Sequence, residues 1–570
     1  MKVMNQPRQP AAIQEAPYQS RQLESRATTG EPTRVCDSCI RKKAKLQATK
    51  GDQPAFVASS EEKLARREPH ATRQASSVEQ RPLFRPFLEP YARPISESSP
   101  QTSDNGQSPA QYEISTQQEE YLLDQYFEIA QDANPIFSKA NFLDKYRNSL
   151  CNEGLISVMV TITAKLIGYK LFPEECVLNT RIDLLLGSSL LEDDIVGDSP
   201  SLDQFRKACM LALYDFHQFP GHQSWMRIGR LTRMAYRIGL DRLEPLRAMC
   251  PDWGCLSKED IEEWRSVWWC IYRLDSYSNL SSGTPYLIDN SFVNTSLLLD
   301  ACELNGESSP LTLYLPGDSE HLWKLLPTIT SNLETRMKNI HIISISAMRQ
   351  AGLVAGIRLL RPQEEIASHL VKFERHLSAL CLALPHGWFN PGRNAFTNES
   401  PLDHHARLIT VFHLRMARLL SSIVACSRTQ DDGWMSSWQQ VLETCQDIAH
   451  IAGQWNSSFC IQVDPAICFI IFTALIFLDL HMKSTGTASP ELLSTIDHDK
   501  TVLRLQLDQF ARIWTLPRLL SLSFAGFSES VSGPLSHRQI TLILSRFEAP
   551  LHPRWLGFLS TAQATLAAFQ

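Results

Sequence analysis

The chain has 570 residues, of which 43% are hydrophobic and 20% are charged, so most of it is expected to bury a large core. Its net charge is −6, yet residues 1–100 hold 17 Lys and Arg against 11 Asp and Glu, a balance of +6, which leaves −12 for the other 470 residues. A basic N-terminal segment on an acidic body predicts an anion-binding arm, and the 14 scattered cysteines exclude a disulfide framework.

Neither a secretory signal nor a membrane span is expected. Met1–Pro10 lacks the apolar stretch of a signal peptide. The longest apolar run, Ala466–Leu478, has 13 residues, fewer than the about 20 that cross a bilayer, so it predicts a buried helix. Cysteines such as Cys209, Cys270 and Cys468 lie in apolar runs, where free thiols behave as small hydrophobes. We therefore expect a soluble chain in a reducing compartment, with no membrane partner.

The first motif along the chain is a pair of thiols followed by cations. Residues 1–35 are polar and are expected to be disordered. Within residues 36–60, Cys36 and Cys39 have the spacing with which two sulfurs reach one tetrahedral zinc. The cations that follow would attract a phosphate backbone, and they are Arg41, Lys42, Lys43 and Lys45. After Cys39 the next cysteine is Cys151, so the local sequence begins a zinc site without completing it.

A linker and a helical body follow. Residues 61–118 become rich in Pro, Ser and Gln, a composition that excludes a helix interior and predicts a disordered linker. From Glu119, apolar residues recur at three- and four-residue steps and predict a helix that Pro135 ends. The residues that form this pattern are Leu122, Leu123, Tyr126, Phe127 and Ala130. The sequence therefore predicts a body that begins at residue 119.

The body and the C-terminal region predict an all-α fold. Residues 119–485 show almost only helical periodicity, with loops marked by Gly, Pro and Asp clusters. Residues 486–570 predict a further helical region, with a helix near Lys500–Trp514 and a loop at Ser528–Pro534.

Two predicted helices in the body have the clearest patterns of apolar, cationic and aromatic residues. Within His222–Leu240 one face is apolar and Gly239 stands where a helix ends. Four arginines line another face, which is interpreted as a solvated cationic surface or, alternatively, as an anion site; they are Arg227, Arg230, Arg233 and Arg237. The next predicted helix, Glu262–Tyr277, carries three tryptophans that favour a core position over a cofactor platform; they are Trp264, Trp268 and Trp269.

Two further patterns suggest chemistry. Leu191–Asp198 clusters carboxylates, and Asp193 and Asp194 could hold magnesium in an α-helical enzyme that acts on isoprenoid diphosphates. The stretch ends in turn residues, however, so we interpret it as a solvated acidic loop. Three histidines on one predicted helix are expected to be surface or core residues, and they are His404, His405 and His413.

Three motifs in order along the body resemble the regulatory domain of fungal transcription factors. The first is Asn134–Leu143, with the sequence Asn-Pro-Ile-Phe-Ser-Lys-Ala-Asn-Phe-Leu. The second is Trp225–Arg242, which contains Trp-Met-Arg-Ile-Gly-Arg-Leu. The third runs from Trp264 through Asp275 to Asp289 and includes Gly-Thr-Pro. Ser276 and Thr284 stand where that family usually has a basic residue and an arginine, respectively.

The resemblance implies an all-α regulatory domain that regulates, dimerises and senses effectors, behind an N-terminal zinc cluster that binds DNA. In that family six cysteines share two zincs, and a basic helix enters the major groove. Cys36–Lys45 resembles the first half of this cluster, but Leu46 stands in the third cysteine position, and Phe56 and Ser59 stand in later ones.

The resemblance also implies a nuclear regulator with promoter DNA, a homo- or heterodimer partner and the transcription machinery as its partners, and secondary metabolism as its pathway. A co-regulator that has lost its own DNA binding and acts by dimerisation is the alternative. The magnesium-dependent enzyme is the third hypothesis.

Overall fold

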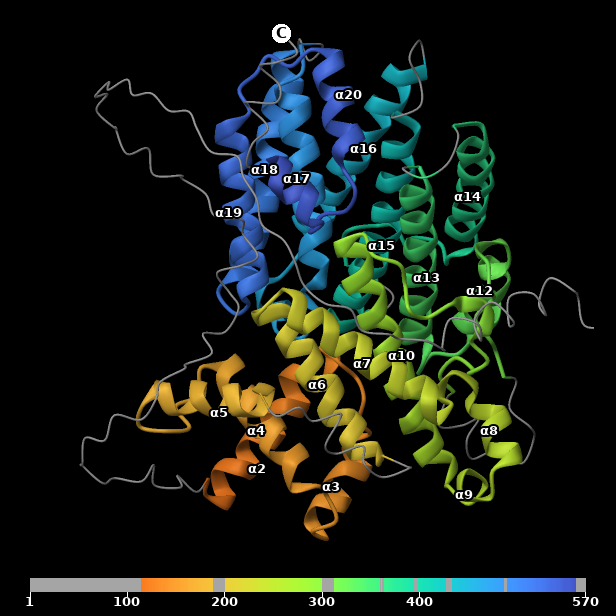
Figure 1. Cartoon of the computed structure of the whole chain (residues 1–570), viewed down its shortest axis with the longest axis vertical. Helices are drawn as coiled ribbons and strands as arrows, with labels where there is room; N and C mark the ends of the chain where they lie inside the picture. The colour runs from red at the N-terminus through yellow and green to blue at the C-terminus, as the bar shows by residue number, and fades with distance from the viewer. Residues whose placement is uncertain are drawn as a thin grey trace, which may run out of the picture. The chain divides into compact units, whose positions relative to one another are not determined.

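The computed structural model describes residues 114–187, 200–299, 312–358, 360, 363–393, 398–426, 433–485 and 489–559, all within one unit spanning Arg81–Gln570. These residues form helices joined by turns (Figure 1). In this described part the β-structure is limited to isolated bridges, such as that between Ser296 and Tyr314. The predicted all-α fold class is confirmed.

The helices fall into three groups along the chain. The first comprises α2 (Thr116–Gln125), α3 (Lys139–Arg147), α4 (Glu153–Ile167), α5 (Glu175–Gly187), α6 (Leu202–Gln218) and α7 (His222–Ile238). The second comprises α8 (Leu243–Met249), α9 (Pro251–Gly254), α10 (Lys258–Ser282), α12 (Leu322–Ser331), α13 (Arg336–Ile357) and α14 (Gln363–Ala383). The third comprises α15 (Pro401–Cys426), α16 (Gly433–Ala452), α17 (Cys468–Met482), α18 (Pro490–Ala511), α19 (Thr515–Ser530) and α20 (His537–Arg546), and residues 553–559 are also helical.

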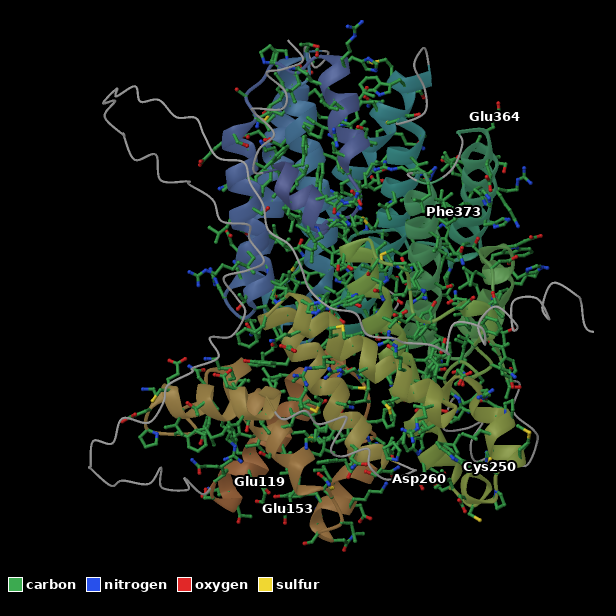
Figure 2. The ribbon with its side chains drawn as sticks, in the orientation of Figure 1. Glu119, Glu153, Cys250, Asp260, Glu364 and Phe373 are labelled. Carbon is green, nitrogen blue, oxygen red and sulfur yellow. The ribbon has the colours of Figure 1, made fainter. Side chains whose placement is uncertain are left out.

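Side chains fill the spaces between these helices. Glu153 and Glu364 lie on outer surfaces, whereas Phe373 of α14 is buried against the rest of the core (Figure 2). The 11 cysteines in the described ranges are free thiols.

Helix α10 is the central element and packs against α6, α7 and α13 (Figure 1). Ser257 caps its N-terminus by accepting the Asp260 N–H at 3.0 Å, and Gly283, with a φ of +69°, caps its C-terminus. The helix is 25 residues long and therefore extends beyond both ends of the predicted range. Its three tryptophans are buried, which confirms the predicted core position; they are Trp264, Trp268 and Trp269.

Helix α17 lies among α15, α16, α18 and α19, and its neighbours explain its apolar sequence. Three helical stretches among the described residues are long and apolar enough to cross a membrane: Arg336–Ile357, Pro401–Cys426 and Pro465–Met482. The third has 18 residues, so the 13-residue run understates its length. In the structure, 67%, 83% and 94% of these apolar windows are buried inside the protein. The predicted buried helix at Ala466–Leu478 is thus confirmed.

The segment between α2 and α3 is anchored to α6 and α10 by buried polar side chains. Arg206 of α6 donates from Nε to the Ile136 carbonyl at 3.2 Å, and its Nη2 lies 2.8 Å from Oε1 of Glu263. Asn134 Oδ1 accepts from Nη2 of Arg273 at 3.0 Å. The first sequence motif therefore packs directly onto the third.

Asp275 organises the end of α10. Its carboxylate is fully buried and accepts four hydrogen bonds from three parts of the chain. Asn279 Nδ2 donates to Oδ1 at 2.7 Å, and the N–H groups of Leu287 and Ile288 donate at 3.1 and 3.2 Å. Arg349 of α13 donates from Nη1 to Oδ2 at 3.0 Å. These donors compensate for the desolvation of the charge.

Arg349 is buried and makes several contacts besides its ion pair with Asp275. Its guanidinium lies 4.6 Å from the Tyr272 ring centroid and 4.0 Å from that of Tyr286. It also donates to Ser276 Oγ at 2.8 Å and to the Ile288 carbonyl. A cation from α13 thus contacts Ser276, at the position where the sequence departs from the family pattern.

The expected helix boundaries differ from the observed ones near both ends of the described part. The first helix begins at Thr116 and not at Glu119, because the Ser115 hydroxyl caps it by accepting the Gln118 N–H at 3.3 Å. It passes into π and 3-10 turns and ends at residue 133, before Pro135 as expected.

Toward the C-terminus, the predicted helix at Lys500–Trp514 is part of α18, which begins ten residues earlier at Pro490 and ends at Ala511. Helix α19 continues to Ser530, into the range predicted as a loop.

Replacing Arg349 with Met is expected to lower the free energy of unfolding by about 3–5 kcal/mol, because Asp275 would remain buried without its cation. The matched control Arg237→Met removes an exposed arginine from α7 and is expected to change stability by less than about 0.5 kcal/mol. Urea-induced unfolding followed by circular dichroism measures both. Equal effects of the two changes would show that the buried pair does not hold α13 in place.

Candidate functional site

The residues that the sequence suggests for zinc and DNA lie outside the described residues. They precede residue 114 and are Cys36, Cys39, Arg41, Lys42, Lys43 and Lys45. A tetrahedral zinc needs four ligands, so the two thiols alone do not fit a zinc cluster. Asp193 and Asp194 of the acidic loop also lie outside the described ranges.

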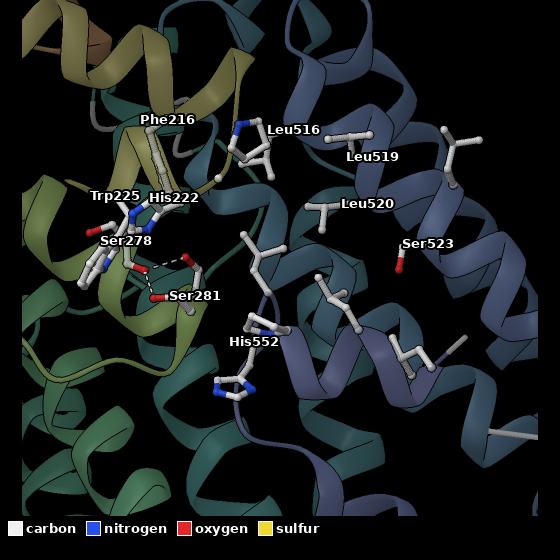
Figure 3. Close-up of a pocket in the computed structure, with 18 of the residues that line it drawn as sticks. Phe216, His222, Trp225, Ser278, Ser281, Leu516, Leu519, Leu520, Ser523 and His552 are labelled. Atoms are coloured by element: carbon white, nitrogen blue, oxygen red, sulfur yellow. Dashed lines mark hydrogen bonds between the residues drawn. The ribbon is translucent and has the colours of Figure 1, made fainter. Parts of the chain in front are cut away.

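A cavity of about 510 Å³ is the main candidate site in the described part. It lies between the end of α10, the start of α7, helix α19 and the segment that follows α20 (Figure 3). Figure 3 shows Trp225, Ser278 and Ser281 on one side and Leu516 and Leu520 on another. The site is therefore built from segments far apart in the sequence.

The α10 wall of the cavity is rich in hydroxyl groups. Ser281 Oγ donates to the Ser278 carbonyl at 3.1 Å, and Ser282 Oγ donates to the same carbonyl at 2.6 Å. Thr284 Oγ1 donates to Asn279 Oδ1 at 2.6 Å. Ser282 Oγ also lies 2.8 Å from Thr284 Oγ1, so the hydroxyl groups of the wall are hydrogen-bonded to the helix and to one another, and their remaining lone pairs can accept hydrogen bonds.

The segment that follows α20, residues 547–559, is called the C-terminal segment and closes another side of the cavity. The Leu551 N–H donates to the Ser281 carbonyl at 2.6 Å and ties this segment to α10. Gly283 permits the approach, because a Cβ there would lie 3.1 Å from the Ala549 Cβ and 3.2 Å from the His552 ring. The glycine of the third sequence motif therefore has two roles, ending α10 and admitting the C-terminal segment.

The cavity is connected to the buried Asp275 by hydrogen bonds. Trp225 Nε1 donates to Asn279 Oδ1 at 3.1 Å, and Asn279 in turn donates to Asp275. Trp225 comes from the second sequence motif, and Asn279 and Asp275 come from the helix of the third. The two motifs thus meet at the cavity wall.

The arginine stripe of α7 is mainly a solvated surface, as interpreted from the sequence. Arg230, Arg233 and Arg237 are exposed. Arg227 differs, because it turns inward: its Nε donates to the buried Asp215 carboxylate at 2.9 Å and its Nη2 to the Leu186 carbonyl at 2.6 Å. Arg227 therefore joins α5, α6 and α7 and does not contribute to the cationic surface.

A second cavity, of about 240 Å³, lies beside a buried ion pair. Arg273 Nε lies 3.3 Å from Asp464 Oδ2, and His217 Nε2 lies 2.9 Å from Asp464 Oδ1. Burial acts to raise the pKa of Asp464, but His217 and Arg273 outweigh it and hold the pKa below its ordinary value. The pair connects α10 to the turn before α17, which is a structural role.

The three histidines of α15 are core residues. His404 contacts the Pro391 carbonyl at 2.8 Å, and His405 contacts the Pro401 carbonyl at 2.7 Å and accepts the Asn456 N–H at 3.0 Å. Fully buried His413 lies 2.6 Å from the Tyr277 hydroxyl and 2.9 Å from the Ser344 hydroxyl. Each ring thus has polar partners within the protein.

One group in the described ranges has side chains close enough to share a metal ion: Asp318, Glu320 and His321. All three are exposed, and Glu320 lies 3.7 Å from the Lys372 ammonium. The group is compatible with an ordinary solvated surface.

Sequence analysis missed the walls of the larger cavity. A signal was present in the serines at 278, 281 and 282, which directly follow the predicted end of the helix at Tyr277. No comparable signal marked Leu516 or Leu520 as their neighbours, since those residues follow more than 200 positions later.

The structure defines an all-α domain whose three sequence motifs meet around buried ion pairs and one uncharged cavity. The family model for the fungal specific transcription factor domain matches residues 123–432, more than half of the chain. The chain belongs to this family of transcription factors and is a transcriptional regulator. The family is not one of enzymes, so the match gives no support to the enzyme hypothesis.

A partial relative is the azaphilone cluster-specific transcription factor azaR of Aspergillus niger. It is 28% identical over 165 residues, which cover 28% of this chain and 35% of the relative. The chain therefore matches only about a third of that relative's length. No solved structure matches the chain.

Replacing Gly283 with Ala is expected to destabilise the protein more than replacing Gly239 with Ala. Both glycines have left-handed φ angles, +69° and +82°, so each change costs about 1–2 kcal/mol. At Gly239 the nearest side-chain atom would lie at an ordinary 3.5 Å, whereas at Gly283 the new methyl would displace Ala549 and His552 and cost about 1 kcal/mol more. Thermal unfolding compares the two variants, and equal losses would contradict the close approach.

Acidification is expected to destabilise the protein partly through His413. Burial, His341 and Arg273 hold the pKa of His413 well below its ordinary value, so the ring is neutral in the folded state and takes up a proton on unfolding below about pH 6.5. Stability should therefore fall as the pH falls below 6.5. His413→Gln should make this slope shallower by up to about 1.4 kcal/mol per pH unit.

Urea-induced unfolding at pH 7.5, 6.0 and 5.0 measures the slope. Tyr277→Phe is the control: it removes the 2.6 Å contact to His413 but keeps the titrating ring, so it should lower stability at every pH and leave the slope unchanged. A wild-type slope in His413→Gln would be inconsistent with a buried neutral histidine.

Proposed function

We propose that this chain is a nuclear, pathway-specific regulator of a secondary-metabolite gene cluster. The observation that carries the proposal is the family match over residues 123–432. The partial similarity to a regulator named for an azaphilone cluster supports the secondary-metabolite assignment. A regulator of transcription acts at promoters, which accounts for the nuclear assignment.

Contact with promoter DNA is assigned to the cations of residues 36–60, which are Arg41, Lys42, Lys43 and Lys45. Four cations within five residues suit a phosphate backbone, and phosphate contacts position a protein without reading the base sequence. Selectivity for a promoter then depends on a dimer partner whose cluster is intact. The acidic body, which carries −12, suits recruitment of the transcription machinery.

A second candidate function is that of a co-regulator without DNA contacts of its own. This candidate is favoured by the small number of zinc ligands. The family's two zincs are held by six thiols, and residues 36–60 supply only Cys36 and Cys39. Such a protein would reach promoters only through its dimer partner.

Chromatin immunoprecipitation of the full-length protein from its host tests the proposal. We expect enrichment at promoters of the biosynthetic genes that neighbour its own gene. Lys42→Gln combined with Lys43→Gln should reduce this enrichment on the order of tenfold, because two phosphate contacts are lost. The matched control is Arg66→Gln with Arg67→Gln, which removes the same charge from the linker.

The outcomes separate the two candidates. Full enrichment of the Lys42 and Lys43 variant would favour the co-regulator, since the partner alone would then hold the protein on DNA. Absence of the wild-type protein from the neighbouring promoters would overturn the pathway assignment.

A further inference from the structure

We propose that the 510 Å³ cavity binds an uncharged, largely apolar small molecule that donates at least one hydrogen bond. The volume lies in the range of about 300–1,000 Å³ that is typical of small-molecule sites. Binding of such a molecule does not depend on the proposed function, whereas an effect of that binding on transcription rests on it.

The lack of Asp, Glu, Lys and Arg in the described walls disfavours an ionised ligand. Among the described residues that line the cavity, none is Asp, Glu, Lys or Arg. Two histidines line the cavity. His222 is exposed to solvent and stacks on Trp225 with ring centroids 6.3 Å apart, and His552 contacts Glu548 at 3.1 Å and accepts the Arg554 N–H at 3.2 Å. An ion in this cavity would lose its hydration without gaining a counter-charge, which strongly disfavours it.

The hydroxyl groups of α10 define the polar end of the ligand. Ser281 and Ser282 each donate their proton to the Ser278 carbonyl, so their oxygens face a ligand as acceptors. A ligand that offers an O–H or N–H group matches this end. A ligand with acceptors only would have to break the contacts within the helix.

The opposite walls define an apolar body. Leu516, Leu520 and Phe527 of α19 are buried behind the cavity, and Leu522 of the same helix is 55% exposed. Leu556 faces them from the C-terminal segment. An aromatic or alkyl body against the half-buried or exposed side chains of Leu519, Leu522 and Leu556 would remove apolar surface from water.

A bound molecule would contact three elements at once. It would touch α10 near Ser281, helix α19 near Leu520 and the C-terminal segment near Leu556. The Ser281 carbonyl already holds the Leu551 N–H, and Asn279 connects the wall to Asp275. Occupancy would therefore stabilise the attachment of the C-terminal segment to α10, and this is the change through which a ligand could regulate the protein.

Three related probes test the chemistry on the full-length protein. N-phenyl-1-naphthylamine is neutral, apolar and carries one N–H group. Its sulfonated analogue, 8-anilinonaphthalene-1-sulfonate, adds a charge, and its N-methyl derivative lacks the donor. Fluorescence titration should show saturable binding of the neutral amine, at least about 10-fold weaker binding of the sulfonate, and about 2- to 10-fold weaker binding of the N-methyl compound.

Two substitutions locate the binding. Ser523→Phe places a ring in the cavity from α19 and should abolish binding of the neutral amine, whereas Ala525→Phe adds the same ring to an exposed position of that helix and should leave it unchanged. Ser281→Ala should weaken the neutral amine about 2- to 10-fold and leave the N-methyl compound unchanged. Circular dichroism confirms that each variant is folded.

Equal binding of the neutral and sulfonated probes, or equal binding by the Ser523 and Ala525 variants, would overturn the proposal. So would a lack of probe binding together with a change of oligomeric state in Ser523→Phe, measured by light scattering, since a second copy would then occupy the cavity. None of these readouts involves DNA, so failure here leaves the promoter experiment unaffected, and the reverse also holds.

Discussion

The fully buried carboxylate of Asp275 is the constraint on which the described fold most depends. A charge without contact to water is stable only when donors surround it, and here they come from α10 itself, from the Leu287–Ile288 backbone and from Arg349, 74 residues later in the chain. Separation of α13 from α10 would leave that carboxylate unpaired. The pair therefore specifies one arrangement of these helices, which apolar contacts alone would define less sharply.

Buried polar contacts of the same kind explain why the three sequence motifs occur together. Arg206 joins the first motif to α10, and Arg273 joins α10 to the turn before α17. The buried cations Arg206, Arg273 and Arg349 each lie beside a carboxylate, and the described walls of the larger cavity contain no Asp, Glu, Lys or Arg. In a regulator built in this way the ion pairs hold the helices together, while the larger cavity, whose wall residue Trp225 is hydrogen-bonded to Asn279, is available to a ligand.

Much of the helical architecture follows from local sequence. Helix α7 begins at His222 and ends before Gly239, where the spacing of apolar residues and the glycine predict. The tryptophans of α10 are buried because their spacing leaves them on faces that other helices cover. The loop predicted at Ser528–Pro534 was wrong at its start, because helix α19, which packs against α17 and α18, continues to Ser530.

What the sequence by itself determined is the all-α class, most of the helices and the resemblance to a family, since these depend on residues a few positions apart. Only the tertiary structure decided which side chains contact one another. Nothing in the local sequence pairs Asp275 with Arg349, turns Arg227 away from the other arginines of its stripe, or places Leu520 opposite Ser281. These relations depend on contacts between segments tens to hundreds of residues apart, and periodicity along the chain carries no information about them.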